Sequence, residues 1–380
     1  MIRYLKREKI FLLNGKSFTY ALFVNKAGFL QNIYFDKKIS RNKIIEKAVA
    51  ADEKLPCAED KNFDMEFDAM PSEYAFYGRG DYNEPTAVIE REDGSIFSRF
   101  RYKGHKIKNV LPRLGVMPCV RGDGETLVIT LKDDFSDTEI DLNYSVFDDG
   151  DVVVRNAEIK NRGDDTVKLR KAFSFCLQMD SKDFELMRFY GRWAKERTPE
   201  TTPIGHGITK IQSLRGTSSH QLNPFIVLKQ KRCKETAGKC FGFQLVYSGS
   251  FSLCAELSGN DKLRVQGGVS DTFFSWELKS GETFVSPQVL IAYSDKGLGK
   301  LSLEYHDFIR NRIINPDFTY KTRPVVVNNW EATYFNFNDE KLCDIIDAAA
   351  ELGIDTFVLD DGWFGKRDSD TTGLGDWFVN

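Results

Sequence analysis

Two short runs joined by an acidic turn decide the fold class: residues 138–159 read TEIDLNYSVFDDGDVVVRNAEI. Apolar residues occupy every second position from Ile140 to Val146, which is the period of a β-strand with one buried face. The four residues after Phe147, DDGD, are typical of a chain reversal. Val153 and Ile159 then continue in phase on the returning run. The stretch therefore predicts an antiparallel hairpin.

Similar runs extend from this hairpin in both directions along the chain. Apolar alternation recurs at 167–179, 225–228, 242–247, 251–257 and 283–291, whereas helical periodicity is scarce before residue 295. So many short strands predict a mostly β chain with a large sandwich rather than an α/β sheet.

The pattern changes near residue 297. Leu298, Leu301, Tyr305 and Phe308 follow helical spacing, and Pro316 lies soon after this helix. We place a domain boundary at about residue 318, which gives a sandwich domain over 1–318 and a second domain over 319–380.

The second domain reads as strand, helix, strand. An apolar strand is expected at 324–327, a helix capped by Asn338 and closed by Gly353 follows, and a second apolar strand is expected at 356–359. This is a βαβ unit, and its continuous apolar runs predict two parallel strands buried on both faces. A (β/α)₈ barrel takes roughly 250 residues. We therefore expect an incomplete second domain that is molten or borrows cover from the sandwich or another chain.

The amino-acid composition and short motifs limit which partners and cofactors the protein is expected to bind. The 380 residues carry 53 basic and 56 acidic side chains, a formal charge of −3, which argues against nucleic acid as the main partner. The apolar run at 10–13 is too short for a signal peptide or a membrane span. Seven cysteines without a C-x-x-C motif favour reduced thiols in a cytoplasmic protein. The four histidines lack metal-ligand spacing and no nucleotide-binding motif is present, so no metal or cofactor is expected.

Polar residues follow both predicted parallel strands. Residues 328–331 read NNWE after the first strand, and residues 360–363 read DDGW after the second. The carboxyl ends of parallel strands meet at one edge, where ligands bind in βα architectures. Carboxylates beside indole rings suit a sugar, because carboxylates accept bonds from hydroxyls and indoles cover the C–H face. The alternative is that DDG forms only a turn and that the tryptophans belong to the core.

At these strand ends the sequence resembles glycoside hydrolase family 36, the bacterial α-galactosidases. Residues 323–335 (RPVVVNNWEATYF) and 357–365 (FVLDDGWFG) look like the first two barrel strands of the family, and 374–380 (LGDWFVN) looks like the loop that follows. The likeness extends back through the sandwich at 191–197 (GRWAKER) and 215–225 (RGTSSHQLNPF).

The resemblance implies an N-terminal β-supersandwich followed by the first βαβ unit of a (β/α)₈ barrel. It also implies retaining hydrolysis of terminal α-galactosyl residues in melibiose- and raffinose-type oligosaccharides, without a cofactor, by a homotetramer. Trp330, Asp360 and Asp361 would bind galactose. Trp193 and, on a poorer local match, Asp52 would be supplied to the site of a neighbouring protomer.

The resemblance also implies which residues are missing. A retaining glycosidase needs a nucleophilic carboxylate and a second carboxyl group as acid/base, and the family takes them from its fourth and sixth barrel strands. Both are expected beyond Asn380, so the chain looks like a truncated form that is inactive alone. The alternative function is a non-catalytic carbohydrate-binding or oligomerisation module built on the sandwich. An enzyme that uses the sandwich itself is a more distant third.

Overall fold

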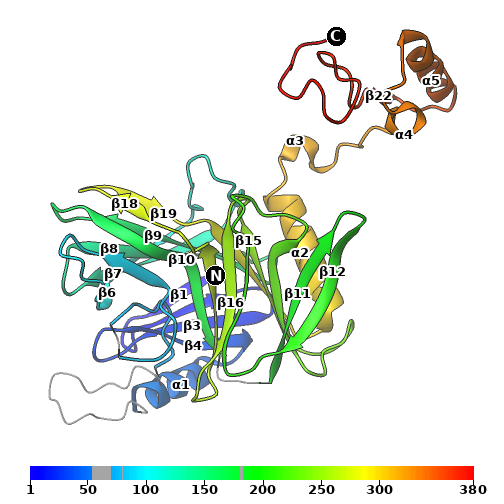
Figure 1. The fold of residues 1–380 in the computed structure, drawn as a ribbon. Coiled ribbons are helices and arrows are strands. Elements are labelled where there is room, and N and C mark those ends of the chain that lie inside the picture. The colour runs from blue at the N-terminus through cyan, green and yellow to red at the C-terminus, as the bar shows by residue number, and fades with distance from the viewer. Residues whose placement is uncertain (54–69, 79, 180–182) are drawn as a thin grey trace. The chain divides into compact units, whose positions relative to one another are not determined.

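The computed structural model describes residues 1–53, 70–78, 80–179 and 183–380 (Figure 1). The chain divides into two compact units, an N-terminal unit over 1–314 and a C-terminal unit over 315–380. The division falls slightly before the boundary of about 318 that we place from the sequence.

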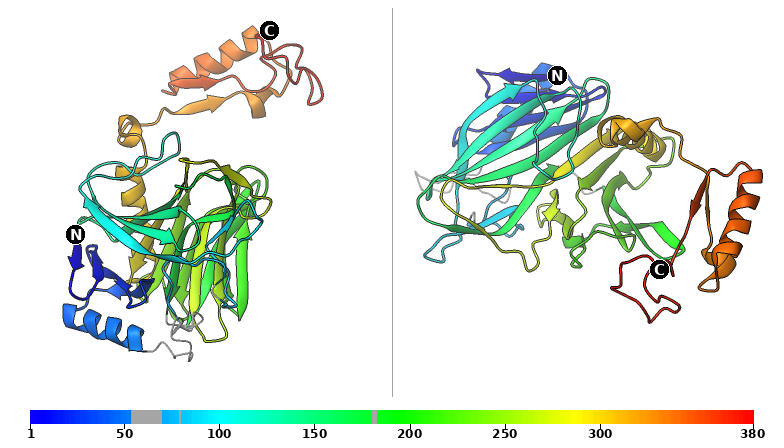
Figure 2. Two further views of the ribbon diagram at one scale, coloured as in Figure 1. Left: turned by 90° about the vertical axis from the view of Figure 1, so that its left-hand side faces the viewer. Right: turned by 90° about the horizontal axis from the view of Figure 1, so that it is seen from above.

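The N-terminal unit begins with a small antiparallel sheet covered by a helix. Its strands, in spatial order, are β1 (Ile2–Leu5), β2 (Ile10–Asn14), β3 (Phe18–Val24) and β4 (Leu30–Lys37). Helix α1 (Arg41–Glu53) runs along this sheet (Figure 2) and packs Ile44 and Ala48 against Ile10 and Phe23. The sequence patterns do not predict this helix, in which Ile44 and Ala48 are the only buried residues of 41–52.

Two larger antiparallel sheets form the sandwich. One has the order β13 (Gly207–Gln212), β16 (Phe251–Leu257), β17 (Leu263–Val269), β10 (Val167–Met179) and β18 (Trp276–Leu278), with β5 (Ala87–Glu90) also paired to β10. The other has the order β12 (Lys195–Pro203), β11 (Phe184–Arg192), β14 (Leu222–Gln230), β15 (Cys240–Val246), β20 (Gln288–Ser294), β9 (Val152–Asn161), β8 (Thr138–Val146), β7 (Glu125–Asp133) and β6 (Phe100–Lys108), with β19 (Thr283–Val285) paired to β9. The predicted hairpin is β8 and β9, with Val146 opposite Val153. The mostly β prediction is confirmed.

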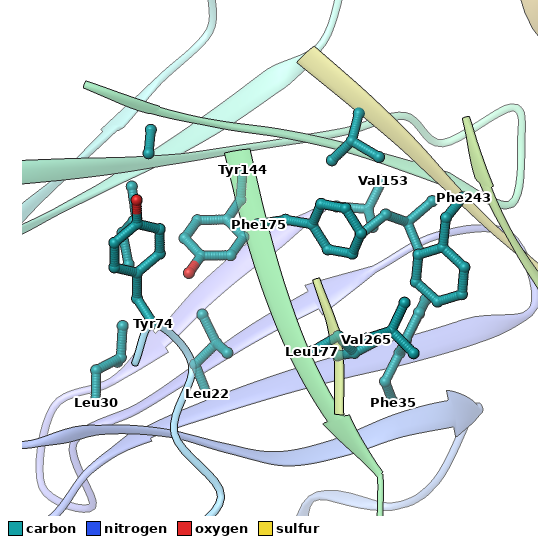
Figure 3. Packing of buried hydrophobic residues seen from close by; sticks show 14 of the residues in the cluster. Leu22, Leu30, Phe35, Tyr74, Tyr144, Val153, Phe175, Leu177, Phe243 and Val265 are labelled. Carbon is teal, nitrogen blue, oxygen red and sulfur yellow. The ribbon is translucent and has the colours of Figure 1, made fainter. Parts of the chain in front are cut away.

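The main core lies between these sheets. Phe175 of β10 stacks on Phe243 of β15 with ring centroids 5.5 Å apart, which joins the two sheets directly (Figure 3). Leu22 of the small sheet and Val153 of β9 belong to the same buried cluster. All three sheets of the unit therefore share one apolar core.

A buried ion pair lies inside this core. The Glu73 carboxylate is 2.6 Å from an Arg155 guanidinium nitrogen, and the two side chains are 0% and 1% exposed. The same carboxylate oxygen accepts hydrogen bonds from the hydroxyls of Tyr20 and Tyr144, and Arg155 donates to the carbonyl of Cys176. Burial raises the pKa of both tyrosines well above the ordinary value, so they remain protonated donors. The network links β3, β8, β9 and β10 to the segment that precedes β5.

Helix α2 (Gly297–Arg312) lies across the outer face of the larger sheet and confirms the predicted change of pattern (Figure 1). Tyr305 packs on Gly242 of β15, where a Cβ atom would lie 2.5 Å from the tyrosine ring. Its hydroxyl donates to the carbonyl of Leu290 at 3.0 Å. A glycine at this strand position therefore allows the close approach that seats the helix.

The C-terminal unit contains the predicted parallel pair. The short helix α3 (Pro316–Thr319) precedes strand β21 (Val326–Asn328), which pairs with β22 (Thr356–Val358). The short helix α4 (Trp330–Thr333) and then α5 (Asp339–Glu351) connect the two strands. The Asn338 side chain accepts a hydrogen bond from the Lys341 amide and caps α5 as predicted.

The prediction that both parallel strands are buried on two faces is wrong for this chain. Val326 and Val358 are 51% and 40% exposed, and Ala349 is the one residue of α5 that is buried. Two strands of three residues and a single helix supply too few side chains to cover a sheet on both faces.

None of the helices described here combines the length and apolar character that a membrane crossing requires. Across residues 1–53, 70–78, 80–179 and 183–380, no group of three or more His, Cys, Asp or Glu side chains could hold a metal ion. The six cysteines of these ranges are free, and Cys57 lies outside them.

The buried ion pair generates a stability prediction. We expect Arg155→Met to lower the free energy of unfolding of the N-terminal unit by about 3–5 kcal/mol, because it leaves the Glu73 charge buried without its cation. Urea unfolding followed by circular dichroism measures this. Arg170→Met is the matched control. Arg170 pairs with Glu90 near the surface, so its loss should change the free energy of unfolding little. Equal stability of the two variants would contradict the role given to the pair.

Candidate functional site

The two parallel strands end side by side in the C-terminal unit. Asn328 is opposite Val358 in the register, so the residues that follow each strand emerge at the same edge of the sheet. Trp330 follows β21, and Asp360 and Asp361 follow β22. The structure therefore brings these three predicted site residues to one end of one sheet.

Asp360 is held by two asparagines from the end of β21. Its backbone amide donates to the Asn329 side-chain oxygen at 2.8 Å, and its carboxylate accepts from the Asn328 side-chain amide at 2.6 Å. Asn329 is 0% exposed and also donates to the Thr333 hydroxyl at 3.0 Å. The asparagine pair thus sets the position of the first aspartate.

Asp361 is held by an arginine from the loop that follows it. Arg367 donates from Nε to Oδ1 at 2.9 Å and from Nη2 to Oδ2 at 2.8 Å, which is a bidentate pair. The hydrogen bonds from Arg367 lower the pKa of the Asp361 carboxyl below its ordinary value. The Asp361 side chain is 27% exposed, whereas that of Arg367 is 7% exposed. The carboxylate is therefore ionised and open to a ligand while its partner is covered.

Aromatic residues lie in the segments that follow the two strands. Trp330 makes edge contacts with Tyr334 and Phe335, whose ring centroids lie 5.3 and 4.9 Å away. The ring of Phe364 contacts Trp377, at 4.8 Å, on the segment that folds back to pair Phe364 with Val379. The set combines fixed anionic acceptors with partly exposed indoles, a combination that suits a polyhydroxylated ligand with an apolar face.

Family models match nearly the whole chain. The glycosyl hydrolase family 36 N-terminal domain matches residues 28–279, and the melibiase domain matches residues 283–380. The chain belongs to glycoside hydrolase family 36. The family 36 resemblance drawn from the sequence is confirmed.

Characterised relatives of this family 36 chain are α-galactosidases. The bifunctional alpha-galactosidase/sucrose kinase AgaSK of Mediterraneibacter gnavus is 40% identical over all of the chain and 41% of the relative's length. Alpha-galactosidase AgaA of Geobacillus stearothermophilus is 36% identical over 100% of the chain and 53% of its own. The crystal structure of the family 36 α-galactosidase AgaB from Geobacillus stearothermophilus superimposes with a TM-score of 0.93 at 37% identity, covering 100% of this chain and 53% of that one. The chain thus spans about half the length of the curated relatives it matches.

The other two predicted site residues of this family 36 chain belong to the N-terminal unit. Trp193 lies in the turn between β11 and β12 and is 81% exposed. Asp52 lies near the end of α1, where its carboxylate is 3.0 Å from the Lys26 ammonium. The sequence analysis assigned both to a neighbouring protomer's site, so they are not expected to join Trp330 within one chain.

Sequence reasoning missed the two groups that anchor the aspartates. Asn329 stands in the run NNWE at a strand end without a predicted role, and Arg367 lies outside the predicted site. A basic residue six positions after Asp361, in a loop that begins with DDG, was an available signal of a charge partner. Its pairing depends on the loop conformation, which spacing alone does not give.

The asparagine anchor generates the second prediction. We expect Asn329→Ala to destabilise the C-terminal unit by about 1–3 kcal/mol, because the Asp360 amide loses its acceptor and the removed side chain is fully buried. Amide hydrogen exchange at Asp360 should accelerate. Asn336→Ala is the control, because Asn336 is an exposed asparagine of the same unit. Unchanged exchange at Asp360 in Asn329→Ala would show that the amide is protected by other means.

Proposed function

We propose that this chain supplies the N-terminal sandwich and the first two barrel strands of an α-galactosidase, and that its C-terminal unit forms one wall of a galactose subsite. The observation that carries the proposal is the pair of fixed carboxylates, Asp360 and Asp361, at the end of β22, next to the end of the parallel strand β21, which leads into Trp330. Relatives that match the chain over its full length are α-galactosidases.

The proposed ligands are α-galactoside oligosaccharides. Crystal structures of variants of the relative AgaA contain raffinose and stachyose, which supports this class of substrate. In the proposed subsite Asp360 and Asp361 accept hydrogen bonds from the hydroxyls of the terminal sugar. Trp330 covers an apolar C–H face of the ring. These residues bind and orient the sugar, and no bond-breaking step is assigned to them.

Cleavage with retention needs a nucleophile and an acid/base about 5–5.5 Å apart. Asp360 and Asp361 are committed to backbone and side-chain anchors, and Asp361 is paired with a cation that stabilises its ionised form. Asp361 is therefore held as an anion and not as a proton donor. We therefore propose that turnover requires carboxylates from later barrel strands, as the family resemblance implies.

The N-terminal unit has a proposed role in assembly. The exposed turn that carries Trp193 would reach the galactose subsite of a neighbouring protomer in a homotetramer. Asp52 would do the same only if it exchanged its Lys26 partner for a ligand. We also propose that the protein is cytoplasmic and that its cysteine thiols are reduced.

The binding role is tested with D-galactose and the purified chain. We expect chemical shift changes at Asp360, Asp361 and the Trp330 indole in NMR spectra during titration, and a loss of affinity of at least about tenfold in Asp360→Ala, because bonds to a charged acceptor are removed. Asp355→Ala is the matched control, since Asp355 is exposed and precedes β22 at its other end. Shift changes confined to other residues would contradict the proposed subsite.

The catalytic expectation is tested separately with a chromogenic α-galactoside. We expect the 380-residue chain alone to show no turnover above background, because neither member of the proposed catalytic pair is supplied by Asp360 or Asp361. Turnover at ordinary glycosidase rates that disappears in Asp360→Ala would show instead that this chain holds the reacting carboxylates.

A further inference from the structure

The two aspartates of the proposed subsite differ in how much of their hydrogen-bonding capacity is already used. A carboxylate offers about four lone-pair positions, two on each oxygen. Within the described residues Asp361 accepts three bonds, from Gly362 and Arg367 on Oδ1 and from Arg367 on Oδ2. About one position, on Oδ2, stays open for a ligand.

Asp360 accepts fewer bonds, and from weaker donors. Its Oδ1 accepts from the Asp361 amide at 2.8 Å, and its Oδ2 accepts from the Asn328 side-chain amide at 2.6 Å. Both donors are neutral, and about two lone-pair positions remain open. The two adjacent carboxylates therefore differ in the number of acceptor positions that stay open for a ligand.

Arg367 is itself rigidly held. Its Nη1 donates to the carbonyl of Thr372 at 2.8 Å, and its guanidinium lies 5.6 Å and 5.9 Å from the ring centroids of Phe335 and Phe364. Phe335 also contacts Trp330. The arginine therefore connects the carboxylate to the aromatic side of the site, and a planar fork held in this way fixes the carboxylate plane as well as its charge.

We propose that Arg367 is a positioning residue of the galactose subsite, which fixes Asp361 as an ionised acceptor for one sugar hydroxyl and leaves Asp360 to accept up to two. The inference rests on the proposed function, because it deepens the account of the same site. Arg367 does not touch the sugar in this arrangement. It acts through Asp361.

The charged groups around Asp361 are few. Arg367 is its cation, Asp360 is the adjacent anion, and Asp370 acts on Arg367. When Arg367 is removed, Asp361 keeps the neighbouring negative charge of Asp360 and loses its bidentate donor. Its affinity for protons must then rise, and its plane is no longer fixed.

The experiment follows the carboxyl carbons of Asp360 and Asp361 by NMR in the full 380-residue chain as pH is lowered, with and without D-galactose. We expect the Asp361 carboxyl of the unaltered chain to protonate at lower pH than an ordinary aspartate, because Arg367 holds its ionised form. In Arg367→Gln the Asp361 midpoint should rise, and the dissociation constant for D-galactose at pH 7 should increase at least about tenfold. Arg367→Lys keeps the positive charge but loses the bidentate geometry of the guanidinium. Its Asp361 titration midpoint should therefore lie between those of the unaltered chain and Arg367→Gln, and its galactose affinity should stay closer to that of Arg367→Gln.

Lys366→Gln is the control, because it removes the same charge from the adjacent, exposed position. Exchange protection of the Gly365 amide, which donates to the Phe378 carbonyl, reports whether the loop stays folded in each variant. With the loop folded, an Asp361 midpoint or a galactose affinity in Arg367→Gln equal to that of the unaltered chain would overturn the inference. Carboxyl signals that ignore galactose in the unaltered chain would instead overturn the proposed function, while the midpoint comparison still judges the Arg367–Asp361 pair.

Discussion

The ion pair between Glu73 and Arg155 is the interaction on which the N-terminal unit depends most. A charge at 0% exposure is stable only when its partners are all in place. Those partners are Tyr20 from the small sheet and Tyr144 from the larger sheet, and Arg155 also binds a carbonyl of β10. Apolar packing around them tolerates many arrangements, whereas this network, which pairs one oxygen of Glu73 and leaves the other without a partner, forms in one. It therefore specifies how three sheets meet.

The arrangement of the C-terminal unit depends on a different feature, which is that two parallel strands end at the same edge of their sheet. Because β21 and β22 are parallel and in register, two stretches that lie 30 residues apart place their polar residues at one edge. Different hydrogen bonds then hold the two aspartates. The asparagines at the end of β21 bind Asp360, and Arg367 of the loop after β22 binds Asp361. The proposed binding surface thus belongs to a small unit whose strands are themselves half exposed.

Local patterns predicted those parts of the structure that local physics decides. The hairpin of β8 and β9, helix α2, the Asn338 cap of α5 and the parallel pair all follow from period and turn chemistry. Helix α1 was missed because tertiary contacts of Ile44 and Ala48 support a weakly patterned segment. The Glu73–Arg155 pair and the Arg367 fork were missed because they join residues through the folded chain, and no spacing encodes them.

The most direct test of the account is a crystal structure of the chain with methyl α-D-galactopyranoside. The account predicts a sugar whose hydroxyl oxygens lie within hydrogen-bond distance of Asp360 and Asp361, with Trp330 against its C–H face and more bonds to Asp360 than to Asp361. A sugar bound elsewhere, for example in the 240 Å³ cavity lined by Asn32, Gln178 and Lys239 in the N-terminal unit, with the strand ends empty, would contradict it.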